Sequence, residues 1–447
     1  MSNAKKPKNK GQLEPSGVKT SGIHWHHSDL VAAAKLATQA TISVTHLVEE
    51  VHQSVLGTMG FEGKAGGTSA NQASKGMTGL VYDAVRTITH WVGGAIDTGY
   101  NLAQPLLAKA EGNRVQAHST REREAVLAAL NGVVGDRLAS AGNPLATPMR
   151  LRYQGQVLDL KLDLKLDPRF DPMFDSSKAR SDLRLERKWL VVIHGLCMND
   201  LQWTHRIGKA NPVENNHAEM LAKTFGYIPI YLRYNTGLSI SENGRDLSNQ
   251  LEILTKTFPE MKELSVLAHS MGGLLIRSAI SQAAHQETNE GEKSGQPSDW
   301  RGRLGRVVFL GTPHHGAPLE RAGQWVDILL GSTPFSAPFK RLTQLRSAGI
   351  TDLRYGHLTA DHRPLPLPEG VACFSVAATT AAKRSVLADR LLGDGLVPLN
   401  SALGIHKTPG KSLYFPKERQ RIFYKMNHME LLSRPEVAEQ LLEWFRD

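Results

Sequence analysis

The stretch V-L-A-H-S-M-G-G, residues 266–273, decides the fold. The apolar run that precedes Ser270, in E-L-S-V-L-A-H (263–269), predicts a short buried strand. Apolar residues after Ser270 recur at helical spacing, starting with Leu274 and Leu275. Ser270 therefore lies at a strand-to-helix junction, in a tight turn that tolerates only small neighbours. This arrangement is typical of a nucleophile elbow, which exposes a serine hydroxyl above a sheet.

The second half of the chain alternates apolar runs with helical patterns, of which 242–258 and 435–446 are the clearest. This rhythm predicts a mostly parallel, doubly wound sheet with helices on both faces, an α/β fold. In such sheets the ligand site lies beyond the carboxyl ends of the strands. The other predicted strands are 188–195, 227–234, 305–312, 370–377 and 419–426.

Two further residues follow predicted strands and complete a serine-based constellation. Asp394 lies between glycines in G-D-G-L-V-P, and His428 lies in N-H-M-E-L-L. Alone, Asp394 would be read as a turn aspartate and His428 as a surface histidine. Together with Ser270 they follow the chain order nucleophile, acid, base that this fold uses. We expect His428 to accept the Ser270 proton and Asp394 to orient the imidazole, with His406 as the best rival base.

An oxyanion hole is expected from two backbone amides. Gly195, at the end of the first buried strand, lets the chain bend so that the Leu196 N–H faces the serine. The Met271 N–H follows the serine directly and supplies the second donor. We expect His194 to order this loop, and His314 and His315 to shape the rim of the pocket. The residues predicted to line the substrate site are His194, Gly195, His269, Thr312, His314, His315, Trp325 and Leu329.

Residues 188–447 resemble alpha/beta-hydrolase serine esterases and lipases. A-H-S-M-G-G (268–273) resembles the elbow of bacterial lipases with alanine in the first position. G-T-P-H-H-G-A-P (311–318) resembles a segment of the lipase and GPI inositol-deacylase-like branch. D-G-L-V-P (394–398) and N-H-M-E-L-L (427–432) match the acid and base segments. The resemblance implies the alpha/beta-hydrolase fold and a catalytic triad; it gives nothing for the first 147 residues.

The N-terminal third differs in composition from the rest of the 447-residue chain. Residues 1–27 are predicted to be a disordered basic tail, where several lysines contribute to a net charge of +10. Residues 28–147 carry three amphipathic helical stripes, the last of which starts near Ser119 with a capping box. We expect these helices to pack on each other and on the catalytic domain, 148–447. The sharper alternative is that one of them lies on a membrane surface.

A long apolar insertion, residues 318–366, is predicted to form a lid or acyl-pocket wall over the strand ends. An apolar cover indicates an acyl ester with a hydrophobic chain, and the alternative is that the insertion simply completes the core. The expected activity is therefore serine carboxylic-ester hydrolysis of the lipase or esterase type. A phospholipase, thioesterase or acyltransferase would use the same triad, and a non-catalytic membrane-associated binding protein is the alternative of another class.

Several further expectations concern partners and location. The two cysteines, Cys197 and Cys373, cannot form a disulfide framework and are expected to be buried free thiols. The lysine-rich start is not followed by an apolar region, so no secretory signal is expected, and no uninterrupted apolar run predicts a membrane span. We expect no cofactor, no metal ligands and no nucleic acid. A cytoplasmic location, with peripheral membrane contact through the N-terminal helices, fits this picture.

Overall fold

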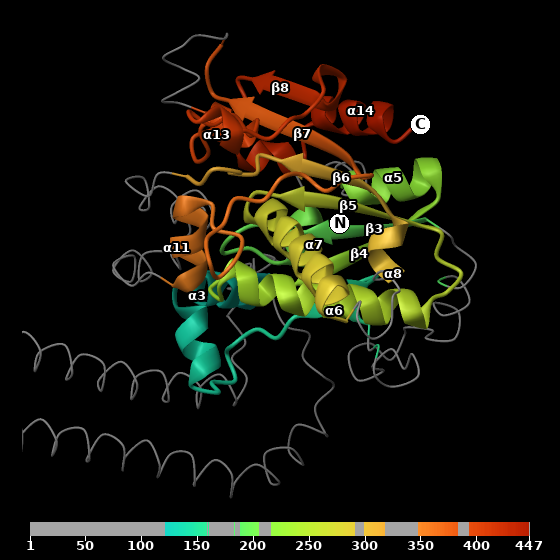
Figure 1. Cartoon of the computed structure of the whole chain (residues 1–447), viewed down its shortest axis with the longest axis vertical. Helices are drawn as coiled ribbons and strands as arrows, with labels where there is room; N and C mark the ends of the chain where they lie inside the picture. The colour runs from blue at the N-terminus through green and yellow to red at the C-terminus, as the bar shows by residue number, and fades with distance from the viewer. Residues whose placement is uncertain are drawn as a thin grey trace, which may run out of the picture.

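The computed structural model describes eight parts of the chain: residues 121–158, 160, 183, 188–204, 216–290, 299–317, 347–382 and 393–446. Several predictions lie outside them: the basic tail, the first two helical stripes, and the 318–346 part of the insertion with Trp325 and Leu329. The described residues form one mixed sheet with helices on both faces (Figure 1).

The sheet has the order β2-β1-β4-β3-β5-β6-β7-β8. Neighbouring strands from β4 to β8 are parallel, whereas β1 pairs antiparallel with both β2 and β4. The predicted mostly parallel, doubly wound alpha/beta-hydrolase sheet is thus confirmed. The strands are β1 (Arg150–Tyr153), β2 (Gln156–Val157), β3 (Lys188–Ile193), β4 (Tyr227–Arg233), β5 (Glu263–His269), β6 (Leu304–Leu310), β7 (Ala372–Thr379) and β8 (Gln420–Tyr424).

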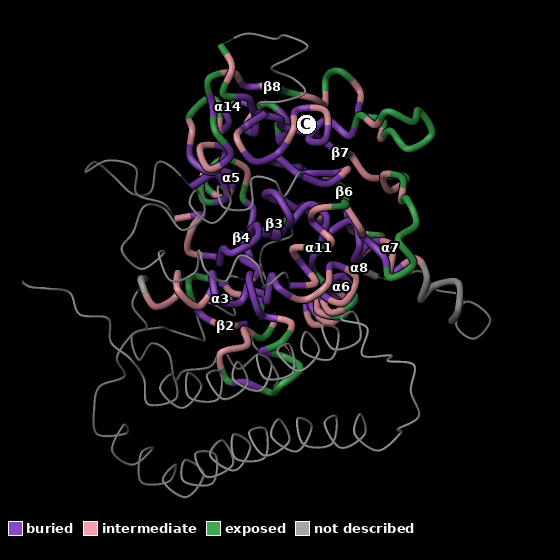
Figure 2. The backbone as a smooth tube through the Cα atoms, turned by 90° about the vertical axis from the view of Figure 1, so that its left-hand side faces the viewer, coloured by how far each residue is buried: buried purple, intermediate pink, exposed green. Residues whose placement is uncertain are grey.

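Helices cover both faces of the sheet (Figures 1 and 2). None of the helices in the described ranges is both long and apolar enough to cross a membrane. The α-helices are α3 (Arg121–Ser140), α5 (His217–Phe225), α6 (Ile240–Thr257), α7 (Met271–Glu290), α8 (Asp299–Arg303), α11 (Ala348–Tyr355), α13 (Leu399–Ala402) and α14 (Pro435–Trp444), and the short 3₁₀ turns are η1 (Asp200–Thr204), η4 (Pro409–Lys411), η5 (Lys417–Arg419) and η6 (Met429–Leu432).

The alternation of side chains along a strand explains why the sheet needs two covers. In β3, Val191 and Ile193 belong to one apolar cluster, while Leu190 and Val192 belong to another. The first cluster continues into α6, α7 and α8, and the second into α5 and α14. Because β3 has apolar residues on both faces, its sequence is a continuous apolar run rather than an alternating one.

The predicted third helix is present as α3 and packs against the catalytic part of the chain. Its Gly135 carbonyl accepts a hydrogen bond from Asn235 Nδ2 at 2.8 Å, and its Gly132 carbonyl accepts one from Ser347 Oγ at 2.7 Å. Arg233 on β4 also pairs with Glu124, at 2.6 Å between Nη1 and Oε2. This helix therefore joins the α/β core rather than standing apart from it.

Candidate active site

Ser270 occupies the turn between β5 and α7. It is one of the non-glycine residues with a positive φ, +56°, and its side chain is buried. Its amide donates to the Leu310 carbonyl of the neighbouring strand at 2.8 Å, and its carbonyl accepts from the Gly273 amide at 3.0 Å. A left-handed conformation at a residue with a Cβ is uncommon and persists only where the surroundings impose it. The chain thus holds this serine in the strained turn that the sequence predicted.

The two glycines after Met271 are required by close packing. A Cβ at Gly272 would lie 2.8 Å from the carbonyl oxygens of both Ile193 and His194, at the end of β3. A Cβ at Gly273 would lie 2.0 Å from Thr312 Oγ1, just past the end of β6. The first turn of α7 therefore rests directly on the ends of two strands, which only residues without side chains allow.

Asp394 and His428 form a buried hydrogen-bonded pair, with 2.6 Å between Oδ2 and Nδ1. The other carboxylate oxygen, Oδ1, accepts the amides of Leu396 at 3.0 Å and Val397 at 2.7 Å. An ionised carboxylate only accepts hydrogen bonds, so the His428 Nδ1 carries the proton and Nε2 presents its lone pair. The His428 amide also donates to the Asp394 carbonyl at 3.0 Å, which fixes the two loops to each other.

The Asp394–His428 pair lies beside the serine turn. His269, directly before Ser270, packs its ring 4.5 Å from the His428 ring and bonds the His428 carbonyl through Nε2 at 3.2 Å. A Cβ at Gly311 would lie 3.1 Å from His428 Nδ1, and the preceding Leu310 carbonyl binds the Ser270 amide. The Leu310–Gly311 backbone therefore contacts both the Ser270 amide and the His428 ring, and Ser270 Oγ has no hydrogen-bond partner among the described residues.

The turn after β3 lies against the serine. A Cβ at Gly195 would come within 2.9 Å of the Ser270 Cβ. Cys197 has a φ of +56°, and its amide donates to Thr236 Oγ1 at 3.2 Å, which tightens the turn around Leu196. The turn that contains Leu196 packs on Ser270, and Met271 is the first residue of α7, so both are compatible with the predicted oxyanion hole, which stays a prediction.

The predicted ordering role of His194 has a structural counterpart. Its ring stacks on Tyr234 with 4.5 Å between centroids, and its Nδ1 lies 3.0 Å from the Gly195 carbonyl. Burial lowers the pKa of His194 to about 4, and burial also holds the pKa of His269 well below its usual value. Both imidazoles are therefore neutral at physiological pH and act as packing and hydrogen-bonding groups around the serine turn.

His314 and His315 make different contacts. The buried His314 packs on Phe309 and Phe415, and its Nδ1 lies 3.3 Å from Arg277 Nη1. His315 bonds the Gly404 carbonyl through Nε2 at 2.9 Å. These contacts tie the 311–317 segment to the core and to the loop after α13, and a part for either ring at the pocket rim stays a prediction.

His406 does not bond Asp394 in the described contacts, and Gly311 makes room for the His428 ring. His406, the rival base, accepts the Thr408 amide through Nδ1 at 2.9 Å, whereas the Asp394 carboxylate bonds His428. Gly311, with a φ of +59°, gives the His428 ring its space. A glycine that closes a buried strand is the signal that marks such a close approach.

A parallel sheet with a strained serine at one strand end, and a carboxylate–imidazole pair beside it, defines the alpha/beta-hydrolase class of serine enzymes. Residues 185–402, a little under half of the chain, match the family described as "Putative serine esterase (DUF676)". This segment is similar to the serine esterase domains of that family, and the protein is a serine ester hydrolase. The match includes Ser270 and Asp394 and ends before His428.

Solved structures that match part of this chain include several lipases and esterases. The mature Bacillus licheniformis lipase BlEst2 is 18% identical, with 58% of this chain and 92% of that chain covered and a TM-score of 0.35. A hyperthermophilic esterase from the archaeon Pyrobaculum calidifontis is 12% identical, with 58% and 74% covered and a TM-score of 0.33. Among curated proteins, no sequence matches this chain significantly.

Proposed function

We propose that the protein hydrolyses carboxylic esters through an acyl-serine intermediate formed on Ser270. His428 Nε2 takes the hydroxyl proton as Oγ attacks the ester carbonyl, and returns it to the leaving alcohol oxygen. Water, deprotonated by the same nitrogen, then attacks the acyl-serine; the nitrogen returns that proton to Ser270 Oγ as the acid is released, which restores the free enzyme. Asp394 keeps the imidazole in the required tautomer and stabilises the imidazolium. The observation that carries this proposal is the strained Ser270 turn beside the 2.6 Å Asp394–His428 pair.

The negative charge on the tetrahedral intermediate needs hydrogen-bond donors that are already in place. The Leu196 and Met271 amides are the candidates, because one lies in the turn packed on the Ser270 Cβ and the other starts α7. The loss of one such donor typically lowers kcat by about 10²–10³. Both donors are backbone amides, so their positions depend on the loop path, which the neighbouring glycines determine.

The substrate class we favour is an acyl ester with a hydrophobic chain. The support comes from the apolar composition of 318–366, which includes Trp325 and Leu329, and from its place in the sequence after β6. An apolar cover would bind the acyl chain and exclude water during attack. The same site chemistry would serve a phospholipase, thioesterase or acyltransferase, and only the acceptor and the leaving group would differ.

Peripheral membrane contact and a cytoplasmic location belong to the same proposal. The amphipathic stripes within residues 28–120 and the lysine-rich start have the composition that binds anionic lipid surfaces. Contact with a membrane would bring the site close to a lipid substrate. The comparison of liposome binding by the full chain and by a chain starting at residue 121 tests this point, and equal binding would contradict it.

A fluorophosphonate probe tests the enzymatic proposal, because it phosphonylates only an activated serine. We expect the folded full chain to be labelled and Ser270→Ala to be unlabelled and inactive toward p-nitrophenyl acyl esters. Ser281→Ala, on the same helix α7, is the matched control and should label as the wild type does. Labelling that survives in Ser270→Ala, or none in the wild type, would refute the proposal and favour the binding-protein alternative.

A further inference from the structure

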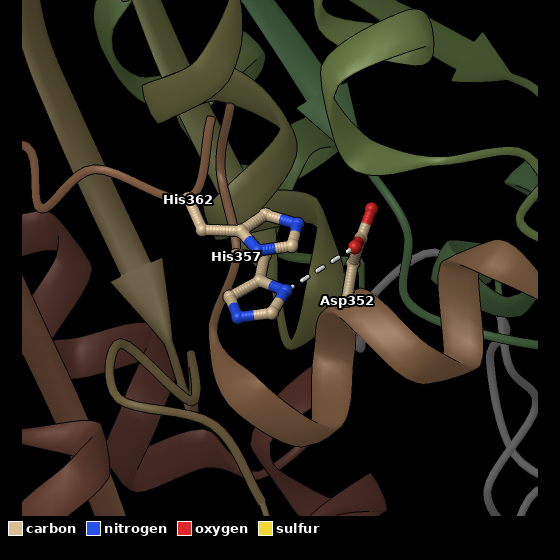
Figure 3. A group of neighbouring side chains, drawn as sticks. All are labelled: Asp352, His357 and His362. Carbon is tan, nitrogen blue, oxygen red and sulfur yellow. Dashed lines mark ion pairs between the residues drawn. The ribbon is translucent and has the colours of Figure 1, made fainter. Parts of the chain in front are cut away.

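Three side chains with metal-binding groups lie together outside the candidate active site (Figure 3). Asp352, His357 and His362 each present one ligand atom, and these atoms all lie within 4.8 Å of one another. Asp352 and His357 are half-buried and His362 is exposed, so the group opens to solvent on one side. None of these residues has a role predicted from the sequence, and none of them contacts the Asp394–His428 pair in a described interaction.

The end of α11 brings Asp352 and His357 together. The Asp352 carbonyl accepts the amides of Gly356, in a left-handed conformation, and of His357 at 3.0 Å. This reversal turns the chain back so that His357 Nδ1 stands 3.7 Å from Asp352 Oδ1. The second carboxylate oxygen, Oδ2, accepts the amide of Ile240 at 2.8 Å. Asp352 is thereby fixed in place, with one oxygen facing the imidazoles.

His362 approaches the same point from the following loop. Its amide closes a turn on the Thr359 carbonyl at 3.0 Å, and its ring stacks on that of His357 with 3.7 Å between centroids and 11° between planes (Figure 3). Stacked rings do not aim both nitrogens at one ion. The exposed His362 side chain therefore has to rotate about its own bonds to aim a nitrogen at the space between His357 and Asp352.

The donor set suits a transition metal. Two imidazole nitrogens and one carboxylate oxygen, with water in the fourth position, form a common zinc environment, with bonds of about 2.0–2.2 Å. Donors in a tetrahedral zinc site stand roughly 3.3–3.5 Å apart, as those bond lengths require. The 3.7 Å between His357 Nδ1 and Asp352 Oδ1 is already close to this spacing, and the rotation of His362 would bring its nitrogen into the same range. Oxygen-preferring Mg²⁺ and Ca²⁺ fit two imidazoles poorly.

We propose that Asp352, His357 and His362 bind a divalent transition metal ion, Zn²⁺ being the best match. The ion would fasten the 357–362 loop to the end of α11. That loop is already anchored to the catalytic core, because the Leu358 carbonyl accepts Ser278 Oγ of α7 at 2.7 Å. A Cβ at Gly356 would lie 2.7 Å from the Gly316 amide, so the same turn also packs on the segment that follows β6. The ion would thus rigidify the described end of the 318–366 insertion.

Metal binding to the full-length chain is the test. We expect isothermal titration with Zn²⁺ to show one more site per chain in the wild type than in the double variant His357→Gln/His362→Gln. Replacement of one ligand, in His362→Gln, should weaken that site about tenfold or more. With Co²⁺ as the probe, the wild type should show the visible absorption of a tetrahedral site, and the double variant should lose it. Zn²⁺ should also raise the melting temperature of the wild type alone.

His406→Gln is the matched control, because His406 pairs with His315, 4.9 Å between ring centroids, with no carboxylate in the described contacts of that pair. It should bind Zn²⁺ as the wild type does. The sequence also holds three histidines in H-W-H-H (24–27), and any Zn²⁺ bound there is common to all variants and cancels in the comparison. His362→Gln changes an exposed side chain, so it keeps the test valid if the double variant fails to fold. Equal stoichiometry and affinity in the wild type and in His362→Gln would overturn the proposal.

Discussion

At the scale of single residues, the hydrogen bonds of Asp394 orient its carboxylate toward His428. Two amides occupy Oδ1, so only Oδ2 is left to bind the imidazole of His428. The neighbouring glycines adopt positive φ values, +48° at Gly393 and +97° at Gly395, which lets the loop fold around the side chain. The sequence signalled this use of Asp394, because an aspartate between glycines after a strand is poorly explained by core packing.

Asp394→Asn tests the tautomer directly. The amide oxygen can still accept the Leu396 and Val397 amides, but the NH₂ group would then face His428 Nδ1 as a donor. The imidazole would hold its proton on Nε2 and lose its capacity as a base. We expect kcat for a p-nitrophenyl ester to fall about 10⁴-fold with little change in KM. The melting temperature is the control, and a kcat near the wild-type value would rule out the assigned role of Asp394.

At the scale of elements, α3 supports the turn that follows β3. A Cβ at Gly132 would lie 2.2 Å from Cys197 Sγ, next to the Leu196 amide. A Cβ at Gly135 would similarly lie 1.9 Å from Asn235 Oδ1. The sequence predicted this helix from its capping box and apolar stripe, but it could not predict the side that the glycines present to the core. A glycine inside a helix lowers the stability of the helix, and its packing role can be recognised only when its neighbour in the structure is known.

Gly132→Ala is expected to destabilise the protein, whereas a glycine-to-alanine substitution inside a helix usually stabilises it. At an open helical site this change stabilises by roughly 1 kcal/mol. Here we expect a lower melting temperature and a lower kcat, because Cys197 must move and carry the Leu196 turn with it. Cys197→Ala in the Gly132→Ala background should restore part of both. Gly302→Ala in α8, where a Cβ would meet nothing within 4 Å, is the matched control and should be neutral or stabilising. A gain of stability in Gly132→Ala would contradict the packing argument.

At the scale of the whole molecule, the sequence predicts the parallel strands because most of their residues are apolar, as in β3 (K-W-L-V-V-I) and β4 (Y-I-P-I-Y-L-R). It misses the antiparallel edge, since Arg150–Tyr153 and Gln156–Val157 are short and alternate with polar residues. It also places Asp394 and His428 as partners, because motif order along the chain carries over to position around the sheet. The sequence does not predict the group of Asp352, His357 and His362. That group depends on the chain reversal after α11 and not on a periodic pattern.

Buried neutral histidines tie the stability of the whole molecule to pH. His217, the first residue of α5, is buried and its Nε2 bonds the Leu431 carbonyl at 3.0 Å, which joins α5 to η6 just after His428. Burial lowers the pKa of His217 to about 4, as it does for His194. An unfolded histidine titrates near 6.5. Between these values the unfolded chain binds a proton that the folded chain refuses, so stability is complete above about pH 6.5 and is lost as pH falls toward 4.

His217→Gln isolates one of these protons, because the glutamine Nε2 can keep the bond to Leu431 and cannot titrate. Each such histidine contributes about 1.4 kcal/mol per pH unit to the slope of the unfolding free energy between roughly pH 4 and 6.5. We expect urea unfolding to show a slightly lower unfolding free energy at pH 7.5 in the variant. Its unfolding free energy should also fall less steeply with decreasing pH, by the slope that the uptake of one proton contributes. Parallel declines in the two proteins would mean that His217 accepts its proton in the folded state.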